Sequence, residues 1–444
     1  MKAKNRDRVH QLLNLEGPLS AQEIRRRLAI SQPTVSRALA QLTGLVLTLG
    51  SGRAVRYALK RPVHSLRSEI PLYLVDAAGT TSHVANLHAL QPRGFYLSAL
   101  TPTLLTSRHY DDLPWFLSDL RPSGFLGRLI PRKFPELNFP PDIRLWNADH
   151  CLYFWSMLAG DLIGNWIVGE HAFALAQRAA LHASVAADQR ASRYEEFASN
   201  ILALGPVGSS AGGEQPKFLV TRLPEAVPVI IKFSPDTGTL VGHRRADLLV
   251  CEHIALETLK AHGIAAARSQ IIRGERRVFL EVERFDRTSE GGRRGLISLA
   301  ILDSEFVGNA GTWRTIAKGL LEAKRISQED YESILWRYYF GLCITNTDMH
   351  AGNLSFFLEG EVLGPIAPVY DMLPMGLSPS SEELPPFEFL PPVLMPNDKQ
   401  IWSTVLPVAA RFWETVQTSK GMSPEIKSYA NQMLDFLKKE QNKR

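Results

Sequence analysis

Residues 346–355 of the chain read Asn-Thr-Asp-Met-His-Ala-Gly-Asn-Leu-Ser. They follow an apolar stretch of helical pattern, residues 334–344, and lead into a predicted strand at residues 354–358. Asp348 and Asn353 stand five positions apart, which is the spacing of the base and the metal-binding asparagine in a kinase catalytic loop. A short loop with both residues supplies an acceptor for a hydroxyl proton and an oxygen ligand for Mg²⁺. Because such a pair also arises by chance, its neighbours along the chain have to agree with it.

A second carboxylate comes after the next predicted strand. Residues 362–366 are of β type, and Pro368-Val369-Tyr370-Asp371 follows them. A carboxylate in this place can be the second metal ligand, as the aspartate of the kinase DFG motif is. The alternative is an ordinary polar residue of a loop.

A segment rich in glycine and serine lies upstream, where residues 205–217 read Gly-Pro-Val-Gly-Ser-Ser-Ala-Gly-Gly-Glu-Gln-Pro-Lys. Glycines at this density let backbone N–H groups approach phosphate oxygens closely. The segment matches neither a Walker A loop nor a GxGxxG motif, so a flexible surface loop is the alternative.

Two charged residues follow on apolar elements. Lys232 lies within a predicted strand, residues 229–233, where an ammonium group without an anionic partner costs desolvation energy. The alternative is an edge-strand lysine that faces water. Glu252 lies on the flank of a predicted helix, where it either pairs with Lys232 or is solvated. The buried face of that helix is expected to carry Leu248, Cys251, Ala255 and Leu259. The ordered series of loop, lysine, glutamate, Asp-x4-Asn and aspartate predicts a phosphoryl-transfer site.

The N-terminal segment differs in charge from the rest of the chain. Residues 1–67 contain thirteen Lys or Arg and three acidic residues, a net charge of +10, whereas the whole chain carries +5. Ser20 and Glu23 have capping-box spacing before a helix with Ala21, Ile24 and Leu28 on one face. A second helix begins after Ser31 and buries Val35, Leu39 and Leu42, and residues 46–49 and 54–59 predict a hairpin. The pattern predicts a winged helix-turn-helix.

The second helix and the wing carry candidate DNA-binding side chains. Base edges and phosphates are commonly contacted by the residue types found at Gln32, Thr34, Ser36 and Arg37 on the helix, and at Arg53 and Arg56 on the wing. The order Gln-Pro-Thr-Val-Ser-Arg resembles recognition helices of MarR- and ArsR-like regulators. The alternative is a protein-interaction module whose arginines are solvated.

Composition sets the broad class of protein. A chain of 444 residues with 45% hydrophobic and 21% charged residues is globular and long enough for two or three domains. No apolar run is long enough to cross a bilayer, and the N-terminus lacks a signal-peptide core, so no membrane partner is expected. Cys151, Cys251 and Cys343 are far apart, which predicts reduced thiols, no zinc site and a cytoplasmic location.

Several blocks resemble the signatures of the HipA toxin kinases, and the resemblance spans about residues 70–400. The blocks are Ser210–Lys217, Ile230–Lys232, Val282–Arg287, Thr347–Asn353 and Pro368–Asp371, with Leu113–Leu117 and Gly160–Gly164 upstream. The resemblance implies an α+β, bilobal protein kinase fold related to lipid kinases, here preceded by a winged helix. The expected domains are residues 1–62, 68–200, 201–286 and 287–444.

The resemblance also implies roles for single residues, with ATP and Mg²⁺ as cofactors. Asp348 would be the general base, and Asn353 and Asp371 would be Mg²⁺ ligands. Main-chain groups of Glu283, Arg284 and Phe285 would bind adenine. Phosphates would be bound by Gly212, Gly213, Glu214, Gln215, Pro216, Lys217 and Lys232. His350, Ala351, Gly352 and Tyr370 would complete the nucleotide site, and Ser210 matches a loop serine that such kinases autophosphorylate.

Three residues depart from the family pattern. The family often has Gly at the position of Met349, Lys at Gly352 and Glu at Pro216. Loss of the lysine removes one cation from the γ-phosphate, but the base and both metal ligands are present, so an active kinase is expected. By resemblance its substrate is a serine or threonine of a translation component such as an aminoacyl-tRNA synthetase. The alternative is a DNA-binding regulator whose kinase-like body only senses ATP.

Overall fold

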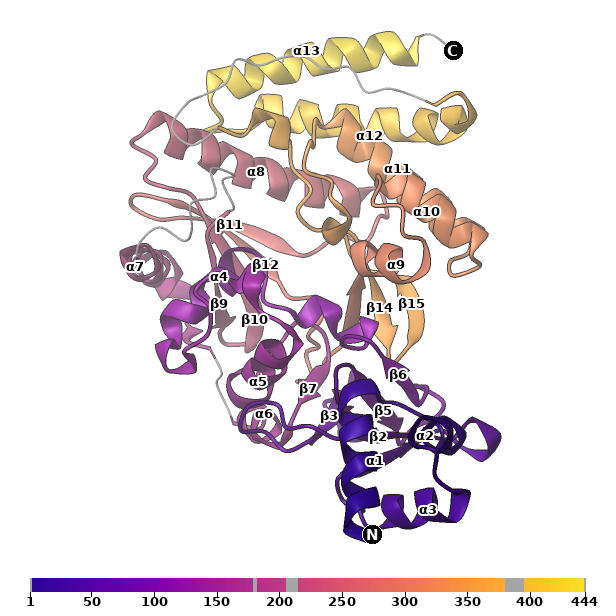
Figure 1. Ribbon diagram of the computed structural model, residues 1–444. Coiled ribbons are helices and arrows are strands. Elements are labelled where there is room, and N and C mark those ends of the chain that lie inside the picture. Colours follow the sequence, from indigo (N-terminus) through magenta and orange to yellow (C-terminus); the bar gives the residue numbers. More distant parts are fainter. Residues whose placement is uncertain (1, 179–181, 205–214, 380–394, 443–444) are drawn as a thin grey trace. The chain divides into compact units, whose positions relative to one another are not determined.

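The computed structural model describes residues 2–178, 182–204, 215–379 and 395–442. The predicted site residues Ser210, Gly212, Gly213 and Glu214 therefore lie outside the described residues. The chain divides into two compact units (Figure 1). Unit 1 comprises Met1–Arg121, Leu137–Leu181 and Glu359–Val362, and unit 2 comprises Pro122–Glu136, His182–Leu358 and Leu363–Arg444.

Unit 1 begins with three helices and a hairpin. They are α1 (Lys2–Glu16), α2 (Ala21–Leu28), α3 (Gln32–Ala40), β1 (Val46–Leu49) and β2 (Arg56–Leu59). The capping box at the start of α2 is confirmed, since Ser20 Oγ accepts from Glu23 N at 3.2 Å and the Glu23 carboxylate accepts from Ser20 N at 2.7 Å. Ile24, Val35 and Leu42 are buried, together with Val9 and Leu13 of α1. The elements expected of a winged helix are therefore present, and α1 is an addition to them.

The hairpin packs on the sheet that follows it in unit 1. Leu49 and Ala58 form one buried cluster with Leu90 and Tyr96. Arg61, at the predicted exit from the module, donates to both carboxylate oxygens of Asp149 at 2.5 and 2.8 Å. The module and the sheet thus share a core.

Within the described residues this sheet has the strand order β6-β5-β4-β3-β7. Its strands are β3 (Glu69–Val75), β4 (Thr81–Ala89), β5 (Phe95–Ala99), β6 (Arg108–Tyr110) and β7 (Trp166–Val168). The neighbouring strands of this sheet pair antiparallel, and burial alternates along most of β3. The helices α5 (Ala148–Leu158) and α6 (Glu170–Ala176) contact β7.

Unit 2 contains a second sheet with the order β11-β12-β10-β9-β8. Its strands are β8 (Ser184–Val185), β9 (Lys217–Arg222), β10 (Val227–Phe233), β11 (Ser269–Arg273) and β12 (Val278–Glu283). The helices α4 (Gly124–Lys133) and α7 (Arg190–Ala203) contact β9, and the long helix α8 (Leu240–Ala261) contacts β10, β11 and β12. The burial predicted for Leu248, Cys251, Ala255 and Leu259 on α8 is confirmed.

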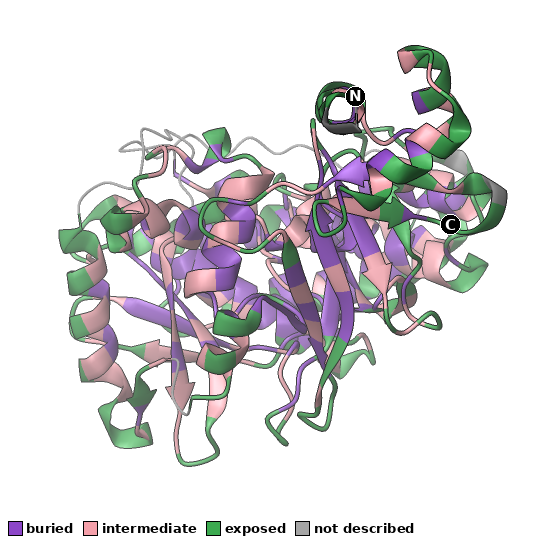
Figure 2. Cartoon of the chain, turned by 60° about the horizontal axis from the view of Figure 1, so that its bottom comes forward, coloured by how far each residue is buried: buried purple, intermediate pink, exposed green. Residues whose placement is uncertain are grey.

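The remainder of unit 2 is mainly helical. Its elements are β13 (Gly295–Ser298), α9 (Leu299–Phe306), α10 (Trp313–Glu322), α11 (Gln328–Cys343), β14 (Ser355–Glu359), β15 (Val362–Ile366), α12 (Lys399–Thr418) and α13 (Pro424–Gln441). The sheet order is β13-β14-β15. Figure 1 shows α12 and α13 side by side, with α8 against α12. Phe412, Trp413 and Tyr429 are fully buried between these helices. In Figure 2 the inner faces of strands and helices are buried and the outer helix faces are exposed.

No helix of the described ranges combines the length and the apolar character that a bilayer span requires.

Candidate active site

Lys232, Glu252 and Asp371 meet in unit 2. The Lys232 ammonium group lies 2.5 Å from Glu252 Oε1 and also contacts Asp371 Oδ1. Lys232 is 7% exposed and Glu252 is 1% exposed. Since β10 lies between β12 and β9, the edge-strand alternative for Lys232 is excluded. The pairing of Lys232 with Glu252 is confirmed, and the solvated alternative for Glu252 is wrong.

The charges of these three residues depend on one another. Burial lowers the pKa of Lys232, but the carboxylates of Asp371 and Glu252 outweigh burial and raise that pKa above its ordinary value. Burial raises the pKa of Glu252, against the opposing effect of Lys232. Burial also acts to raise the pKa of Asp371, yet the positive charges of Lys232 and Lys217 lower it to about 2. Asp371 is therefore ionised at neutral pH, and Lys232 is its counterion.

Asp371 has an unusual backbone conformation. Its φ angle is +50°, in the left-handed region that non-glycine residues rarely adopt. The preceding segment is fixed by Val369, whose N–H donates to Ala265 O and whose carbonyl accepts from Ala267 N, both at 2.9 Å. Strain of this kind persists where the surroundings hold it, and it is common at functional sites.

The loop with Asp348 and Asn353 is held at several points. Asn353 Nδ2 donates to the main-chain carbonyl of Asp348 at 2.9 Å, which directs the amide oxygen of Asn353 elsewhere. Asp348 itself is exposed. His350 precedes the short 3-10 turn Ala351–Asn353, and its Nδ1 accepts from Gly352 N at 3.1 Å.

Two aromatic side chains hold the same loop from outside. Trp313 Nε1 donates to His350 O at 2.9 Å, and the Tyr370 hydroxyl donates to Gly352 O at 2.8 Å. The Tyr370 ring also lies 5.7 Å from that of Phe285, centroid to centroid. Tyr370 thus links the loop that carries Asp348 to the segment predicted to bind adenine.

Met349 and Gly352, which depart from the family pattern, each fit the side chains around them. The sulfur of Met349 lies where a Cβ atom on Gly341 of α11 would stand. A Cβ atom on Gly352 would come within 2.9 Å of His350 Nδ1. The loop is therefore packed for Met349 and Gly352, and a lysine at position 352 would require movement of the His350 ring.

The described end of the glycine-rich segment is attached to β10. Phe233 N donates to Pro216 O at 3.1 Å, and the side-chain amide of Gln215 contacts Phe233 O. Lys217 stands opposite Lys232 in the β9–β10 register. The segment therefore enters the sheet beside the buried lysine.

The predicted adenine-binding segment follows β12, and part of its main chain already has partners. Glu283 N donates to Arg268 O at 2.9 Å, and Arg284 N donates to Pro228 O at 3.0 Å. These two N–H groups already have backbone acceptors, so they are not free to bind adenine. The expectation is therefore limited to the other main-chain groups of Glu283, Arg284 and Phe285. The Arg284 side chain pairs with Asp286 at 2.8 Å.

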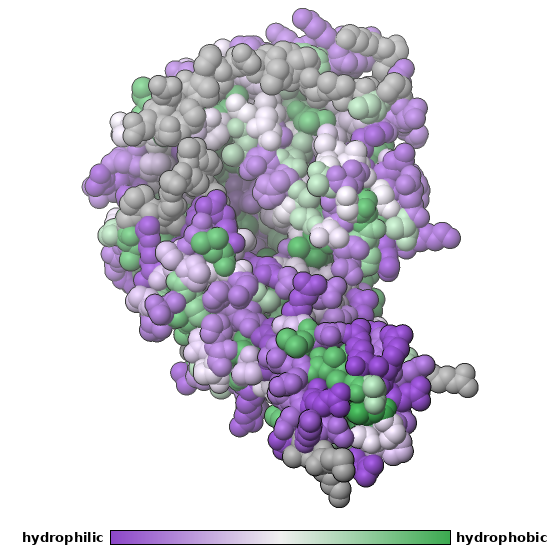
Figure 3. Space-filling view, in the orientation of Figure 1, coloured by the Kyte–Doolittle hydropathy of each residue, from purple (hydrophilic) through white to green (hydrophobic). Residues whose placement is uncertain are grey.

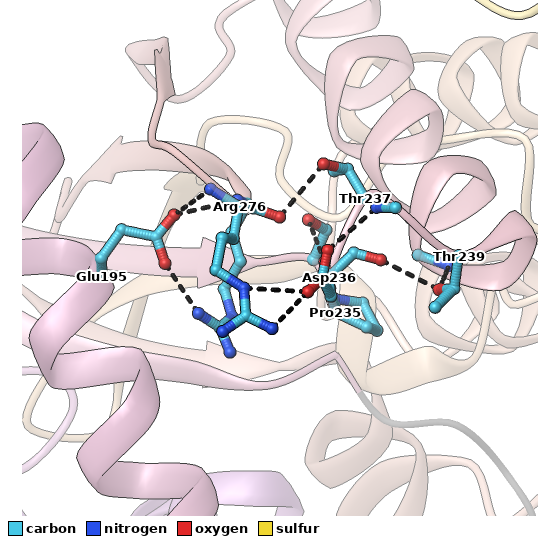
Figure 4. Close-up of polar contacts among 10 residues, drawn as sticks. Glu195, Pro235, Asp236, Thr237, Thr239 and Arg276 are labelled. Atoms are coloured by element: carbon cyan, nitrogen blue, oxygen red, sulfur yellow. Dashed lines mark hydrogen bonds and ion pairs between the residues drawn. The ribbon is translucent and has the colours of Figure 1, made fainter.

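The turn between β10 and α8 is fixed by a polar network (Figure 4). The Asp236 carboxylate accepts from Gly238 N and from the Arg276 guanidinium, and Asp236 O accepts from Thr239 N at 3.1 Å. Thr239 caps α8, and Glu195 of α7 accepts from the amides of Arg276 and Arg277. Figure 4 shows Glu195 and Asp236 on opposite sides of Arg276. The network anchors the beginning of the helix that carries Glu252.

The residues predicted to read DNA lie on α3 of unit 1. Gln32, Ser36 and Arg37 are exposed, whereas Thr34 is half-buried and its hydroxyl lies 2.9 Å from that of Ser31. Arg37 Nε donates to Pro33 O at 3.2 Å, so its guanidinium lies along the helix. In Figure 3 the surface of this module is mostly hydrophilic around a smaller hydrophobic area.

A groove runs between α2 and the wing. Arg56 of the wing lies 3.9 Å from Glu23, and the backbone of Arg53 forms part of the turn Gly52–Ala54. The groove is lined by Ser20, Gln22, Glu23, Arg25, Arg26, Ala54, Val55 and Arg56. Arg25 and Arg26 were not predicted as contact residues, although their helical spacing away from Ile24 already indicated that they are exposed.

The residues offered for Mg²⁺ are one carboxylate, Asp371, and one amide, Asn353. Within the described ranges no group of three or more His, Cys, Asp or Glu side chains is arranged to hold a metal ion. Mg²⁺ in nucleotide sites is commonly held by one or two protein oxygens together with phosphate and water oxygens. The hard oxygen donors of Asp371 and Asn353 fit that chemistry.

Known proteins resemble the chain in sequence and in structure. The sequence model described as "YjjJ-like toxin, middle domain" matches residues 66–177, and that of the "HipA-like C-terminal domain" matches residues 209–438. Toxin YjjJ of Escherichia coli (strain K12) is 38% identical over 436 residues, which are 97% of this chain and 97% of that protein.

Two solved structures are similar at lower identity. HipA of Shewanella oneidensis MR-1, solved with HipB and operator DNA, aligns with a TM-score of 0.49 and 16% identity over 83% of this chain and 97% of that one. The proinflammatory kinase CtkA of Helicobacter pylori aligns with a TM-score of 0.36 and 15% identity over 52% of this chain and 90% of that one.

Proposed function

The chain belongs to the HipA-like toxin family, and from this premise we propose that it is an ATP-dependent serine/threonine protein kinase. The proposal rests above all on the contact of Lys232 with both Glu252 and Asp371. Protein kinases need a strand lysine paired with a helix glutamate, and an aspartate that holds Mg²⁺. The Asp348 loop lies beside this cluster, because Asn346 bonds to Asp348 N and to Asp371 O.

In the proposed reaction each residue has one task. Lys232 and the glycine-rich segment hold the phosphates of ATP, and Asp371 and Asn353 hold Mg²⁺. Bound Mg²⁺ supplies positive charge to the transferring phosphoryl group. Asp348 accepts the proton of a serine or threonine hydroxyl while that oxygen bonds to the γ-phosphorus. The bond from the γ-phosphorus to the oxygen that bridges it to ADP breaks, and ADP leaves.

We extend the proposal to partners by family membership. The substrate is a component of translation, such as an aminoacyl-tRNA synthetase, and its phosphorylation slows growth. The N-terminal module binds DNA through α3 and the wing, which is supported by the exposed Gln32, Ser36 and Arg37 and by the charge of +10 on residues 1–67. Both partners are cytoplasmic, which suits the three free, buried cysteines.

A measurement of γ-phosphate transfer distinguishes the proposed kinase from a DNA-binding regulator that only senses ATP. The purified chain is incubated with Mg-ATP labelled at the γ position, alone and with a cell extract, and labelled proteins are identified. We expect label on the chain and on a translation protein, and its loss in Asp348→Asn. Asp435→Asn, an exposed position on α13, is the matched control and is expected to behave as wild type. Nucleotide binding without any transfer by the wild type would favour the regulator.

A further inference from the structure

We infer that Asn346 is a positioning residue that holds the base-bearing and the metal-binding segments of the proposed site to one another. Asn346 is 3% exposed, and its side chain bonds to both segments, with a further contact of Nδ2 to Met372 Sδ at 3.6 Å. Asn346 Oδ1 accepts from Asp348 N at 3.1 Å, and Asn346 Nδ2 donates to Asp371 O at 3.4 Å. The inference deepens the proposed function and rests on it, since that function gives Asp348 and Asp371 their roles.

Asn346 is itself held firmly by the helix that precedes it. Its own N–H donates to Gly341 O of α11 at 2.9 Å. Thr345, immediately before it, has a φ angle of +60°, which turns the chain away from the helix. The amide is therefore presented from the end of a buried helix, and rigid elements place functional groups more accurately than loops do.

The Asp348 peptide is bonded on both sides by asparagine side chains. Asn346 accepts from its N–H, and Asn353 donates to its carbonyl at 2.9 Å. With both main-chain groups fixed, the remaining freedom of the Asp348 carboxylate is in its own side-chain torsions. A general base needs such a fixed position to meet the substrate hydroxyl in the correct geometry.

The other bond reaches the strained residue. Asp371 has a φ angle of +50°, and its main-chain carbonyl accepts from Asn346 Nδ2. Rotation about the backbone at Asp371 would move both that carbonyl and the carboxylate. Holding the carbonyl therefore limits the directions in which the carboxylate can point.

Only a side chain with a donor and an acceptor on one short amide serves both bonds. An aspartate keeps the acceptor for Asp348 N but loses the donor to Asp371 O, and alanine loses both. Because the Asn346 side chain is buried, water does not readily replace the lost partner. The two substitutions Asn346→Asp and Asn346→Ala thus separate the two bonds.

The first test measures how well the backbone of the Asp348 loop is held in the absence of nucleotide. Hydrogen–deuterium exchange is followed in peptides that cover residues 345–350 of the full chain. We expect slow exchange at Asp348 N in the wild type and in Asn346→Asp, and at least tenfold faster exchange in Asn346→Ala. Unchanged exchange in Asn346→Ala overturns the inference. This result stands whether or not the wild type transfers phosphate, so a failure of the proposed kinase activity is recognised separately.

The second test reads the metal-binding segment. Binding of a nonhydrolysable ATP analogue is titrated at several Mg²⁺ concentrations. Loss of an outer partner of a metal ligand commonly weakens metal affinity by about 10–100-fold. We expect Asn346→Asp to need at least tenfold more Mg²⁺, with binding of the analogue in the absence of Mg²⁺ unchanged. Asn165→Asp, a 5%-exposed asparagine of unit 1, controls for general loss of stability. A wild-type Mg²⁺ requirement in Asn346→Asp contradicts the inference.

Discussion

Met349 occupies the space beside Gly341 that a Cβ atom at position 341 would need. The two residues come from the proposed catalytic loop and from the partly buried helix α11. Met349 stands directly after Asp348, so the packing of its sulfur against the helix bears on the placement of the proposed base. The departure from glycine at position 349 is therefore matched by glycine at position 341.

Gly341→Ala is expected to destabilise the chain. In a helix without such a neighbour, alanine is more stable than glycine by about 1 kcal/mol. Here the added methyl group collides with Met349, and overpacking of this kind costs about 1–3 kcal/mol. Urea unfolding should show the loss, phosphoryl transfer should fall with it, and Met349→Ala in the same chain should restore both. A gain in stability from Gly341→Ala alone would contradict the packing.

Lys232→Met is expected to lower stability in a pH-dependent way. Removal of one partner from a buried ion pair costs about 3–5 kcal/mol because a charge is left uncompensated. In the variant Glu252 and Asp371 lose the cation that contacts both of them, which raises the pKa of both carboxyls. Protonation then relieves their repulsion, so the deficit against wild type should be smaller at pH 5 than at pH 8. Lys217→Met, on the neighbouring strand, should cost less at both values of pH.

The wild type has its own acid transition at this site. The pKa of Asp371 is about 2 in the folded chain, below its value of about 3.9 when unfolded. The contribution of Asp371 to stability is therefore complete above about pH 4 and is lost as the pH falls toward 2. Asp371→Asn should flatten this part of the stability curve, and thermal melts from pH 2 to 5 would show it.

Asp371→Asn and Asp348→Asn are expected to differ in nucleotide binding. The first change removes a proposed Mg²⁺ ligand and should weaken Mg²⁺-dependent ATP binding about 10-fold or more. The second removes the base, so transfer should fall by about 10²–10⁴-fold while ATP binding remains. Calorimetric titration with and without Mg²⁺ distinguishes them. Wild-type transfer by Asp348→Asn would refute the assigned base.

Ser210 is expected to become phosphorylated when the chain is incubated with Mg-ATP. The phosphate carries a charge of about −1.5 to −2 and competes with ATP for the same backbone amides and for Lys232. The phosphorylated chain should therefore be inactive. Mass spectrometry of wild type, Ser210→Ala and Ser209→Ala locates the site. Phosphate on Ser209 alone would move the assignment to that residue.

The arginines of the winged helix are expected to divide by role. Arg37→Ala on α3 should flatten sequence preference at a cost of about 1–3 kcal/mol on the best site. Arg53→Ala and Arg56→Ala should weaken binding to every duplex and reduce its salt dependence. Arg27→Ala is the control, since Arg27 pairs with Glu16 of α1. Gel shifts of the full chain at two salt concentrations measure both effects, and no shift at low salt would end the DNA proposal.

Several elements of the site could be predicted from sequence because they depend on local pattern. The capping box at Ser20, the hairpin and the strand that carries Lys232 follow from spacing and periodicity, and the structure contains them. The partner of Glu252 could not be chosen, because helical spacing gives the flank of a residue and not what faces it. The contact with Lys232 depends on the strand order of the sheet.

Other features have no local signal. The N-terminal half of α1 is polar, so its pattern does not indicate a helix. Among the α1 residues whose burial is described, Val9, Leu12 and Leu13 are the buried ones. The use of the Glu283 and Arg284 amides by the sheet is a backbone property that side chains do not reveal. Asn346 lies in the same sequence segment as Asp348, but its proposed positioning role depends on a bond to Asp371, which lies 25 positions further along the chain.

The hairpin and the sheet of unit 1 share a core, which limits where the chain can be cut to transfer the N-terminal module to another protein. Leu49 and Ala58 are covered by Leu90 and Tyr96, and Arg61 is bonded to Asp149. A cut after residue 62 would expose that apolar face and leave Asp149 without its arginine. Grafting the N-terminal module onto another protein would therefore require the partner strands β4 and β5 as well. In this chain the segment that could be transferred as a stable whole is therefore longer than residues 1–62.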